Sequence, residues 1–283
     1  MVTRIISCFA LRQIADSGQC FRWNRIDDST YGIAAFGRYL EVCQKGDCIT
    51  FGCDENEFEA VWKEYFDLDN DYEGIIAGVD SEDAFLKSAT EYASGMRILK
   101  QELWEMIISF LISQNNNIPR IKKSIEKLSL KYGKRIETGG GCHIHAFPSY
   151  EELSAADKSG LADMGLGYRD EYILEFCRNP YIAVSEAVSK MNYDEAMRYL
   201  MSFKGIGKKV ASCICLFGLH MLDACPIDTW MQKIIDEDYH GNVPQWMTGK
   251  NAGIYQQYAY FYKRDSTGRE GIGLKSGRPG YSG

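Results

Sequence analysis

The first part of the chain alternates apolar and polar side chains in short runs that are separated by clusters of Asp, Gly and Lys. A period of two between turn-forming clusters is typical of strands that bury one face. The pattern therefore predicts an antiparallel meander within residues 1–53. Its strand-like runs cover residues 20–24, 31–36, 39–43 and 48–51.

From about residue 55 the apolar period changes to near 3.6, which indicates helices. Together the two patterns predict an α+β fold class. We expect an N-terminal antiparallel β-sheet domain with helices over 1–95 and a mainly helical core over 96–263. Residues 264–283 are rich in glycine and almost without apolar period, so they are predicted to form a flexible tail. In the second half of the chain, the predicted helices are 150–156, 159–164, 169–177, 182–190, 193–203, 208–219, 229–237 and 252–263.

Composition limits the class of protein. The chain is 45% hydrophobic and 25% charged, which is ordinary for a folded globular protein. No run approaches the roughly eighteen apolar residues that a membrane span needs, and the N-terminus lacks the pattern of a signal peptide. We therefore expect a soluble, unexported protein with no membrane partner.

The ten cysteines are scattered, and no CxxC pair occurs among them. Cys213 and Cys215 are the closest pair, but alternate residues of a helix point about 200° apart, which argues against a shared metal. We predict reduced, mostly buried thiols. A Gly/Cys/His stretch at 139–145 leaves a metal loop open as an alternative, although a flexible surface turn is the simpler interpretation.

Residues 200–213, LMSFKGIGKKVASC, carry the most informative motif. One helix ends near Phe203, a Gly-Ile-Gly turn follows at 205–207, and a second helix begins near Lys208. This order predicts a helix-hairpin-helix over 198–218, with an ordinary helical hairpin as the alternative. The free N–H groups of the second helix, with lysines beside them, suit a DNA phosphate.

Lys209 lies in the first turn of that second helix. The helix dipole and burial are both expected to lower its pKa and make its amine a usable nucleophile. Cys213 follows one turn later on the same face. Asp228 is expected to cap the N-terminus of helix 229–237, and a carboxylate facing Lys209 could also stabilise a cationic transition state or move protons.

Several segments together resemble the helix-hairpin-helix DNA glycosylases, the HhH-GPD superfamily, and within them the bifunctional 8-oxoguanine DNA glycosylases. The likeness runs from about residue 10 to about residue 262, with the segments in family order. The matching segments are SGQCFRW at 17–23, SQNNNIPR at 113–120, GLGYR at 165–169, GIGKKVA at 205–211 and PID at 226–228.

This resemblance implies a DNA repair enzyme that flips a damaged nucleotide out of the duplex into a pocket. Lys209 matches the catalytic lysine that displaces 8-oxoguanine, forms a Schiff base and allows the strand to be cleaved by β-elimination. Asp228 matches the aspartate that supports the positive charge on the sugar. The implied partner is double-stranded DNA that contains 8-oxoguanine, with cytosine opposite the lesion.

The resemblance also implies how the base is recognised. The Gly18 carbonyl accepts a hydrogen bond from N7–H of 8-oxoguanine, whereas N7 of guanine is an acceptor and would leave two acceptors facing each other at about 1–3 kcal/mol. Gln256 reads the Watson–Crick edge, or Gln257 does so if the register shifts by one.

The faces of the base and the rest of the DNA have matching positions as well. Cys213 and Tyr260 cover the two faces of the base, and Phe217 and Pro226 complete the walls. Trp230 stands where many eukaryotic members place a histidine near phosphate. The remaining DNA-binding positions are Asn115 in the space that the base vacates, Arg120, Tyr168 and Arg169 at the estranged cytosine, and Gly205, Gly207 and Val210 at the hairpin.

The net charge of −7, from 32 basic and 39 acidic residues, argues by itself against a nucleic-acid partner. The charges are unevenly distributed, however. Residues 118–135 hold seven basic side chains and one acid, whereas residues 54–91 hold thirteen acids and two lysines. A basic helical zone that permits DNA binding therefore coexists with an acidic zone that can face solvent.

Two other functions remain open at this point: a glycosylase of the same superfamily for another damaged base, and a non-catalytic helix-hairpin-helix DNA-binding module. Many glycosylases for other bases carry an iron–sulfur loop after the aspartate, but no cysteine follows Cys225. We expect no iron–sulfur cluster and no required cofactor, with a structural cation at the hairpin as a possibility. We expect a monomer in the cytoplasm, nucleoid-associated in a prokaryote or nuclear in a eukaryote.

Overall fold

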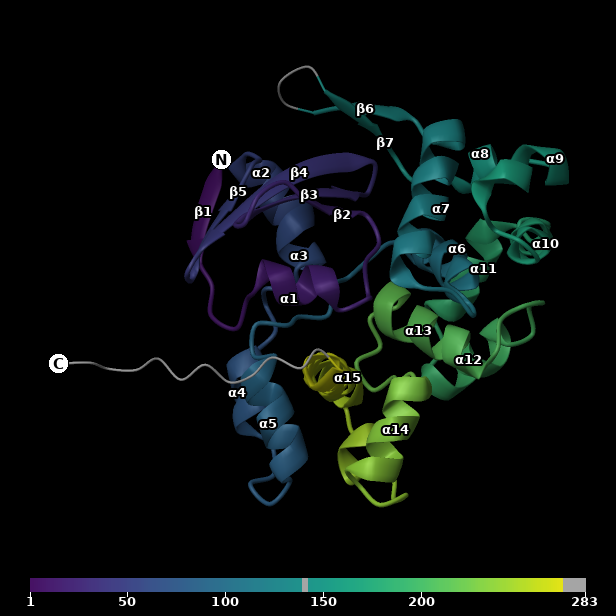
Figure 1. The fold of residues 1–283 in the computed structure, drawn as a ribbon. Coiled ribbons are helices and arrows are strands. Elements are labelled where there is room, and N and C mark those ends of the chain that lie inside the picture. The colour runs from purple at the N-terminus through teal and green to yellow at the C-terminus, as the bar shows by residue number, and fades with distance from the viewer. Residues whose placement is uncertain (139–141, 272–283) are drawn as a thin grey trace.

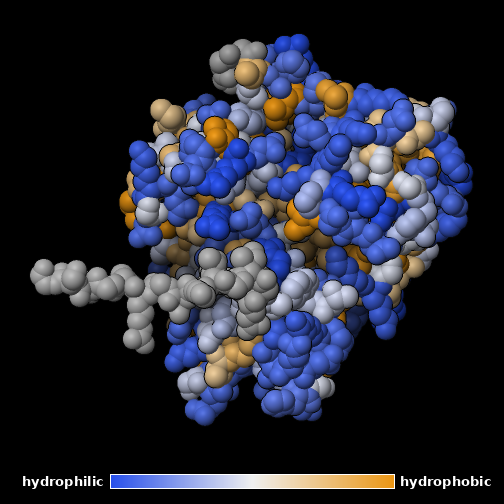
Figure 2. All heavy atoms as spheres, viewed as in Figure 1, coloured by the Kyte–Doolittle hydropathy of each residue, from blue (hydrophilic) through white to orange (hydrophobic). Residues whose placement is uncertain are grey.

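An N-terminal antiparallel sheet and a group of helices make up the computed structural model, which describes residues 1–138 and 142–271 (Figure 1). The predicted α+β fold class is confirmed. This face of the molecule is mostly hydrophilic, with small separate apolar areas (Figure 2). None of the described helices has the length and apolar character needed to cross a membrane.

The sheet is a meander with one additional edge strand. Its strand order is β1-β5-β4-β3-β2, and every neighbouring pair is antiparallel. The alternating runs predicted four of the strands correctly, but they did not predict β1, which pairs with β5 along its whole length. The strands are β1 (Val2–Ile5), β2 (Trp23–Arg25), β3 (Thr30–Ala35), β4 (Arg38–Lys45) and β5 (Cys48–Phe51).

A helical segment packs on the sheet and forms the first core with it. Phe58, Trp62 and Phe66 recur at helical spacing and are buried against the apolar face of the strands. Trp23 Nε1 donates to Tyr65 Oη at 2.8 Å, so the strand and the helix are also joined by a buried hydrogen bond. The helical elements of this part are α1 (Leu11–Asp16), α2 (Glu55–Glu57), a π-helix (Phe58–Trp62) and α3 (Lys63–Tyr65).

The second core lies among the later helices, around α6 (Leu103–Ser113) and α13 (Lys208–Gly218), which pack against each other. Both helices are buried over most of their length. The other helices around them are α7 (Ile118–Tyr132), α8 (Tyr150–Ser154), α9 (Lys158–Leu161), a 3-10 turn (Ala162–Met164), α10 (Arg169–Phe176), α11 (Tyr181–Val188), α12 (Tyr193–Leu200), α14 (Thr229–Glu237) and a 3-10 turn (Gln245–Thr248).

The C-terminal helix α15 (Ala252–Gly271) packs against α5 (Ala84–Tyr92), and α4 (Tyr72–Ala77) lies next to α5 (Figure 1). The prediction of a flexible tail from residue 264 is wrong for 264–271, which continue this helix. Arg264 donates to the Asp16 carbonyl at 2.6 Å, and Asp265 accepts from Tyr92 Oη at 2.9 Å. These contacts hold the helix despite its weak apolar period. Residues 272–283 lie outside the described residues.

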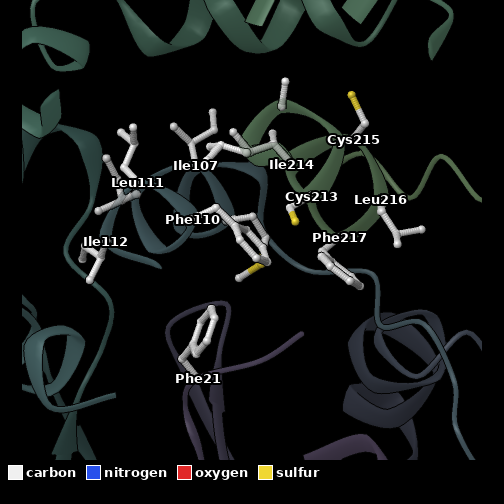
Figure 3. Close-up of a cluster of buried hydrophobic side chains, with 14 of the residues drawn as sticks. Phe21, Ile107, Phe110, Leu111, Ile112, Cys213, Ile214, Cys215, Leu216 and Phe217 are labelled. Atoms are coloured by element: carbon white, nitrogen blue, oxygen red, sulfur yellow. The ribbon is translucent and has the colours of Figure 1, made fainter. Parts of the chain in front are cut away.

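A short hairpin of β6 (Arg135–Glu137) and β7 (His143–His145) extends from the helical part. The surface turn predicted at 139–145 is described only in part, because residues 139–141 lie outside the described residues. Within the described part of the chain, no three His, Cys, Asp or Glu side chains are grouped to hold a metal ion. All ten cysteines are free thiols, of which five are buried. Cys213 and Cys215 point in different directions, as the helical spacing predicts (Figure 3).

Candidate active site

A pocket of about 240 Å³ lies where α6, α13, α14 and α15 meet the segment that follows α1. The structure brings together all the residues predicted for catalysis and base binding, although they come from four separate parts of the chain. They line the pocket as Gly18, Lys209, Cys213, Phe217, Pro226, Asp228, Gln256 and Tyr260, and Gln257 lines it as well.

Lys209 sits in the first turn of α13, after Gly207 at the N-cap position. Its ammonium lies 5.4 Å from the centre of the Phe110 ring and shares a hydrogen bond with Cys213. Burial lowers the pKa of Lys209, but the neighbouring Cys213 and Asp228 act in the opposite direction and outweigh burial, so the pKa is raised overall. The predicted depression of this pKa is therefore wrong. The reason is local: acidic neighbours in the pocket counter the helix dipole.

Asp228 caps the N-terminus of α14, as the sequence predicts. Its Oδ1 accepts hydrogen bonds from the backbone N–H groups of Trp230 and Met231, both at 3.0 Å. These bonds hold the carboxylate in one orientation beside the pocket, and its negative charge acts on Lys209. Capping the helix and facing the lysine are thus compatible in one side chain.

Cys213 and two aromatic rings form the apolar side of the pocket. Phe217 stacks on Phe110, with ring centres 5.5 Å apart and planes 15° apart. Cys213 and both rings face the same space, and Phe21 approaches it from the opposite side (Figure 3). Burial raises the pKa of Cys213, although Lys209 acts in the opposite direction. A flat aromatic ligand would find stacking surfaces here.

Gly18 faces the same pocket with its backbone in the left-handed region, at φ +79°. A Cβ at this position would lie in ordinary contact with Ile118 and Tyr260, so the backbone conformation rather than crowding favours glycine. No hydrogen bond from the described residues reaches the Gly18 carbonyl. This carbonyl is therefore available as an acceptor for a ligand.

Gln256 and Gln257 both line the pocket, so the structure does not choose between the two registers. They are only 3% and 4% exposed, and Gln257 Nε2 donates to Gln256 Oε1 at 2.9 Å. Tyr260, one turn later, also lines the pocket, and the Arg264 guanidinium lies 5.4 Å from the centre of its ring.

The predicted hairpin joins α12 to α13. Gly205 has φ +88°, and a Cβ there would overlap the ring of Tyr172, so two constraints require glycine. The first N–H groups of α13 have no partner within the helix and can bind an anion. The Val210 side chain is buried, which leaves only its backbone for DNA. Beside the hairpin, Lys204 pairs with Glu171 at 2.5 Å.

Arg169 does not face outward as a base-reading side chain. Its guanidinium is buried and donates to the carbonyl of Leu166 at 2.9 Å, to that of Asn115 at 2.9 Å, and to that of Gln114. The structure thus shows Arg169 holding the loop after α6, a role that the sequence did not suggest. Its contact with cytosine stays a prediction, and it requires these bonds to be exchanged. Tyr168 is 49% exposed, with the Arg169 guanidinium 4.6 Å from its ring centre.

The loop after α6 differs from the prediction in one further respect. Asn115 has φ +44° and is exposed, while Asn116, not Asn115, lines the pocket. Arg120 is exposed in the first turn of α7, where its backbone N–H is capped by Asn117 at 3.0 Å. The other lining residues that sequence reasoning missed are Ser17, Phe21, Phe110, Ser113, Ile118, Ile121, Thr229.

Trp230 lines the pocket next to Asp228. The Lys233 ammonium lies 5.7 Å from the centre of its ring. Trp230 therefore contributes an aromatic surface and one N–H donor at the position where many eukaryotic members of the family place a histidine near phosphate.

A helix-hairpin-helix with a half-buried lysine, an aspartate cap and an adjacent base-sized pocket defines the class of helix-hairpin-helix DNA glycosylases. Comparisons with known proteins support this assignment. A profile of the "8-oxoguanine DNA glycosylase, N-terminal domain" matches residues 3–107. The chain is 33% identical over 262 residues to the N-glycosylase/DNA lyase of Saccharomyces cerevisiae, covering 81% of this chain and 68% of the relative.

Solved structures agree in fold and sequence. The 8-oxoguanine glycosylase/lyase of Clostridium acetobutylicum, in complex with double-stranded DNA containing cytosine opposite 8-oxoguanine, matches with a TM-score of 0.87 and 34% identity, over 93% of this chain and 94% of that one. Its form without DNA matches with a TM-score of 0.85 and 35% identity, over 92% and 94% of the two chains. The chain belongs to the 8-oxoguanine DNA glycosylase family.

Proposed function

We propose that this protein excises 8-oxoguanine from double-stranded DNA and then cleaves the strand, as a bifunctional DNA glycosylase and AP lyase. The observation that carries the proposal is the convergence of Lys209, Asp228 and Cys213 with the free Gly18 carbonyl in one pocket. A module that only grips phosphate would have no use for a lysine and a carboxylate inside a pocket of this kind.

The reaction begins when the damaged nucleotide leaves the base stack and enters the pocket. The Lys209 amine attacks C1′ of the sugar while the bond from C1′ to N9 of the base breaks, and the base leaves with the bonding electrons. Overall, one proton passes from the lysine nitrogen to the departing base. The Asp228 carboxylate, held by its two backbone hydrogen bonds, stabilises the positive charge that develops on the sugar.

The lysine adduct then opens the sugar ring to a Schiff base. This electron sink lets a C2′ proton leave, and the 3′ phosphate departs with its bonding electrons, which is the β-elimination that cleaves the strand. The raised pKa of Lys209 keeps the resting side chain as an ammonium, so a proton must be lost before attack. We infer that the first step becomes faster with rising pH.

Selection of the oxidised base follows from the Gly18 carbonyl. 8-Oxoguanine carries N7–H and can donate to this acceptor, whereas guanine presents an acceptor at N7. Guanine in the pocket would therefore leave a buried acceptor unpaired, which costs about 1–3 kcal/mol of binding free energy. Stacking between Cys213 and an aromatic ring of the pocket adds affinity for any purine and therefore little selectivity.

We further infer that the preferred substrate has cytosine opposite the lesion and that the protein acts as a monomer without a membrane. Arg120, Tyr168 and Arg169 lie on the segments that support the cytosine preference. Every step above uses groups of this chain and of the DNA, so the proposal contains no cofactor and no iron–sulfur cluster. We also predict a structural cation at the hairpin as a possibility. We predict that the protein is located with the chromosome, in the cytoplasm of a prokaryote or the nucleus of a eukaryote.

The test is a base-release assay on duplexes that contain 8-oxoguanine opposite each of the four bases, with undamaged guanine and 3-methyladenine duplexes as controls. We expect 8-oxoguanine to be released fastest opposite cytosine, with strand cleavage following, and guanine to be retained. Release of 3-methyladenine without release of 8-oxoguanine would overturn the assignment of 8-oxoguanine as the substrate. Tight binding to DNA without release of any base would overturn the proposal that the protein is an enzyme.

A further inference from the structure

The second glutamine of the pocket, Gln257 on α15, has an unused acceptor. Its side chain is 4% exposed, and its Nε2 donates to Gln256 Oε1 at 2.9 Å. Its own Oε1 is buried and has no hydrogen-bond partner among the described residues. A buried amide oxygen without a donor is unfavourable, and its occurrence in a binding pocket points to a ligand that supplies the donor.

The hydrogen bond between the two amides gives Gln256 a fixed orientation. Because Gln256 Oε1 accepts from Gln257, the amide plane of Gln256 cannot rotate freely. No acceptor among the described residues pairs with Gln256 Nε2, which can therefore donate to a ligand. Both side chains line the same pocket as Cys213 and Phe217, which provide the stacking surfaces. The pair therefore presents one free donor and one free acceptor side by side.

The Watson–Crick edge of a guanine-type base has three adjacent polar groups: the O6 acceptor, the N1–H donor and the 2-amino donor. One glutamine amide can pair with only two neighbouring groups of this edge. The third group needs a further acceptor, or it is buried without a partner. Gln257 Oε1 is an acceptor of this kind, in the same pocket and without another partner among the described residues.

We propose that Gln257 is a specificity-determining residue, whose Oε1 accepts a hydrogen bond from the 2-amino group of the flipped base and whose Nε2 positions Gln256. The inference rests on the proposed function, because it concerns the same pocket and the same reaction. It assigns the pocket to damaged purines that carry a 2-amino group. It also gives the two neighbouring glutamines separate roles instead of one role in alternative registers.

A pair of substrates isolates this contact. 8-Oxoguanine and 8-oxohypoxanthine share the C8 oxygen, N7–H, N1–H and O6, so the Gly18 carbonyl and Gln256 meet the same groups in both. They differ only in the 2-amino group. The ratio of their excision rates therefore reports on the acceptor for that group, while a rate loss common to both reports on the positioning of Gln256.

The experiment measures single-turnover excision of both bases, each opposite cytosine, by the full chain. The first variant is Gln257→Met, which removes the amide oxygen and the amide nitrogen at similar side-chain volume. The second is Gln257→Glu, which keeps an acceptor oxygen but cannot donate to Gln256. Gln245→Met on the exposed 3-10 turn is the matched control. Thermal unfolding of each variant checks that the chain is folded.

We expect the wild-type protein to favour 8-oxoguanine by about tenfold, the factor that one hydrogen bond of ordinary strength supplies. Gln257→Met should bring the ratio close to one, whereas Gln257→Glu should keep the ratio and slow both reactions. If Gln257→Met kept the wild-type ratio of the two excision rates, or slowed the excision of both bases equally, the inference would be overturned while the proposed function stayed intact. A folded wild-type protein that releases neither base would overturn the proposed function, and this inference with it.

Discussion

Replacing Asp228 by asparagine separates its two roles. The carboxylate caps α14 through two hydrogen bonds of 3.0 Å to backbone N–H groups, and it also provides negative charge beside Lys209. Asparagine is as good an N-cap as aspartate and offers the same oxygen, so the hydrogen bonds can remain. What the substitution removes is the charge.

The expected magnitudes differ strongly between stability and rate. Loss of a charge at a helix N-terminus lowers the free energy of unfolding by about 0.3–1 kcal/mol, which for a chain of this size shifts the melting temperature by no more than about 4 °C. Loss of the carboxylate from the transition state should slow base excision by about 10²–10³, the effect of removing one preorganised electrostatic group.

The pH dependence provides a second, independent readout. The Asp228 charge contributes to the raised pKa of Lys209, so the Asp228→Asn protein should hold its lysine as a free amine down to lower pH. The rate should still rise with pH, but its midpoint should lie lower than in the wild-type protein. A purely structural role of Asp228 would leave this midpoint unchanged.

The assay is single-turnover excision of 8-oxoguanine opposite cytosine across a range of pH, together with thermal unfolding. Asp71→Asn is the matched control, because Asp71 caps α4 in the same way, through the Gly74 N–H at 2.8 Å, without lining the pocket. An Asp228→Asn protein that excises at the wild-type rate, or with the wild-type pH midpoint, would refute the electrostatic role and leave only the cap.

Three further predictions concern the hairpin, the loop after α6 and a buried carboxylate. Gly205→Ala should lower the free energy of unfolding by about 2 kcal/mol or more, because φ is +88° and the added Cβ would overlap Tyr172. Gly207→Ala should change it by less than about 1 kcal/mol, because a Cβ there meets no neighbouring atom. Equal effects of the two substitutions in urea unfolding would show that Gly205 is not required in the way described. Arg169→Ala should lower the free energy of unfolding by about 2 kcal/mol, because the hydrogen bonds to the Leu166 and Asn115 carbonyls are lost. It should also weaken the preference for cytosine opposite the lesion. Unchanged opposite-base selectivity in the excision assay would show that Arg169 does not contact the cytosine. Burial raises the pKa of Asp67, but the nearby His220 ring and hydrogen bonds from Asn70 and Tyr72 outweigh burial, so the pKa is lowered. The stabilising effect of this carboxylate should therefore be lost as the pH falls below about 4. Unfolding of Asp67→Asn between neutral and acid pH should therefore show a smaller acid-dependent loss than the wild-type protein, and parallel curves would argue against this role.

Much of the fold could be predicted because short sequence patterns determine where its strands, turns and helix caps lie. The alternation in 20–51 specified strands that bury one face, and the Gly-Ile-Gly turn at 205–207 marked the hairpin through a conformation that only glycine adopts easily. Asp228 was recognisable as a cap because a helical period begins directly after it. The strand β1 was missed because only Val2 of its four side chains is buried and Ile5 is 77% exposed, so no alternation marks it.

The parts of the site that could not be predicted depend on tertiary contacts. Helix α6 is apolar on nearly all sides, so its sequence does not reveal that Phe110 faces the pocket. The pKa of Lys209 depends on Cys213, one turn later on α13, and on Asp228, which only the tertiary fold brings beside it. Two of the three carbonyl groups that hold Arg169 are 54 and 55 residues distant in the chain, and no local sequence pattern predicts backbone acceptors.

Borohydride trapping shows whether Lys209 is the nucleophile, because reduction converts a Schiff base between lysine and DNA into a stable amine. The measurement compares the wild-type protein with Lys209→Gln on duplexes that contain 8-oxoguanine or guanine opposite cytosine. We expect a covalent adduct only with the wild-type protein and the 8-oxoguanine duplex, while the variant still binds that duplex. An adduct with Lys209→Gln, or release of 8-oxoguanine by the wild-type protein without any adduct, would show that Lys209 is not the nucleophile.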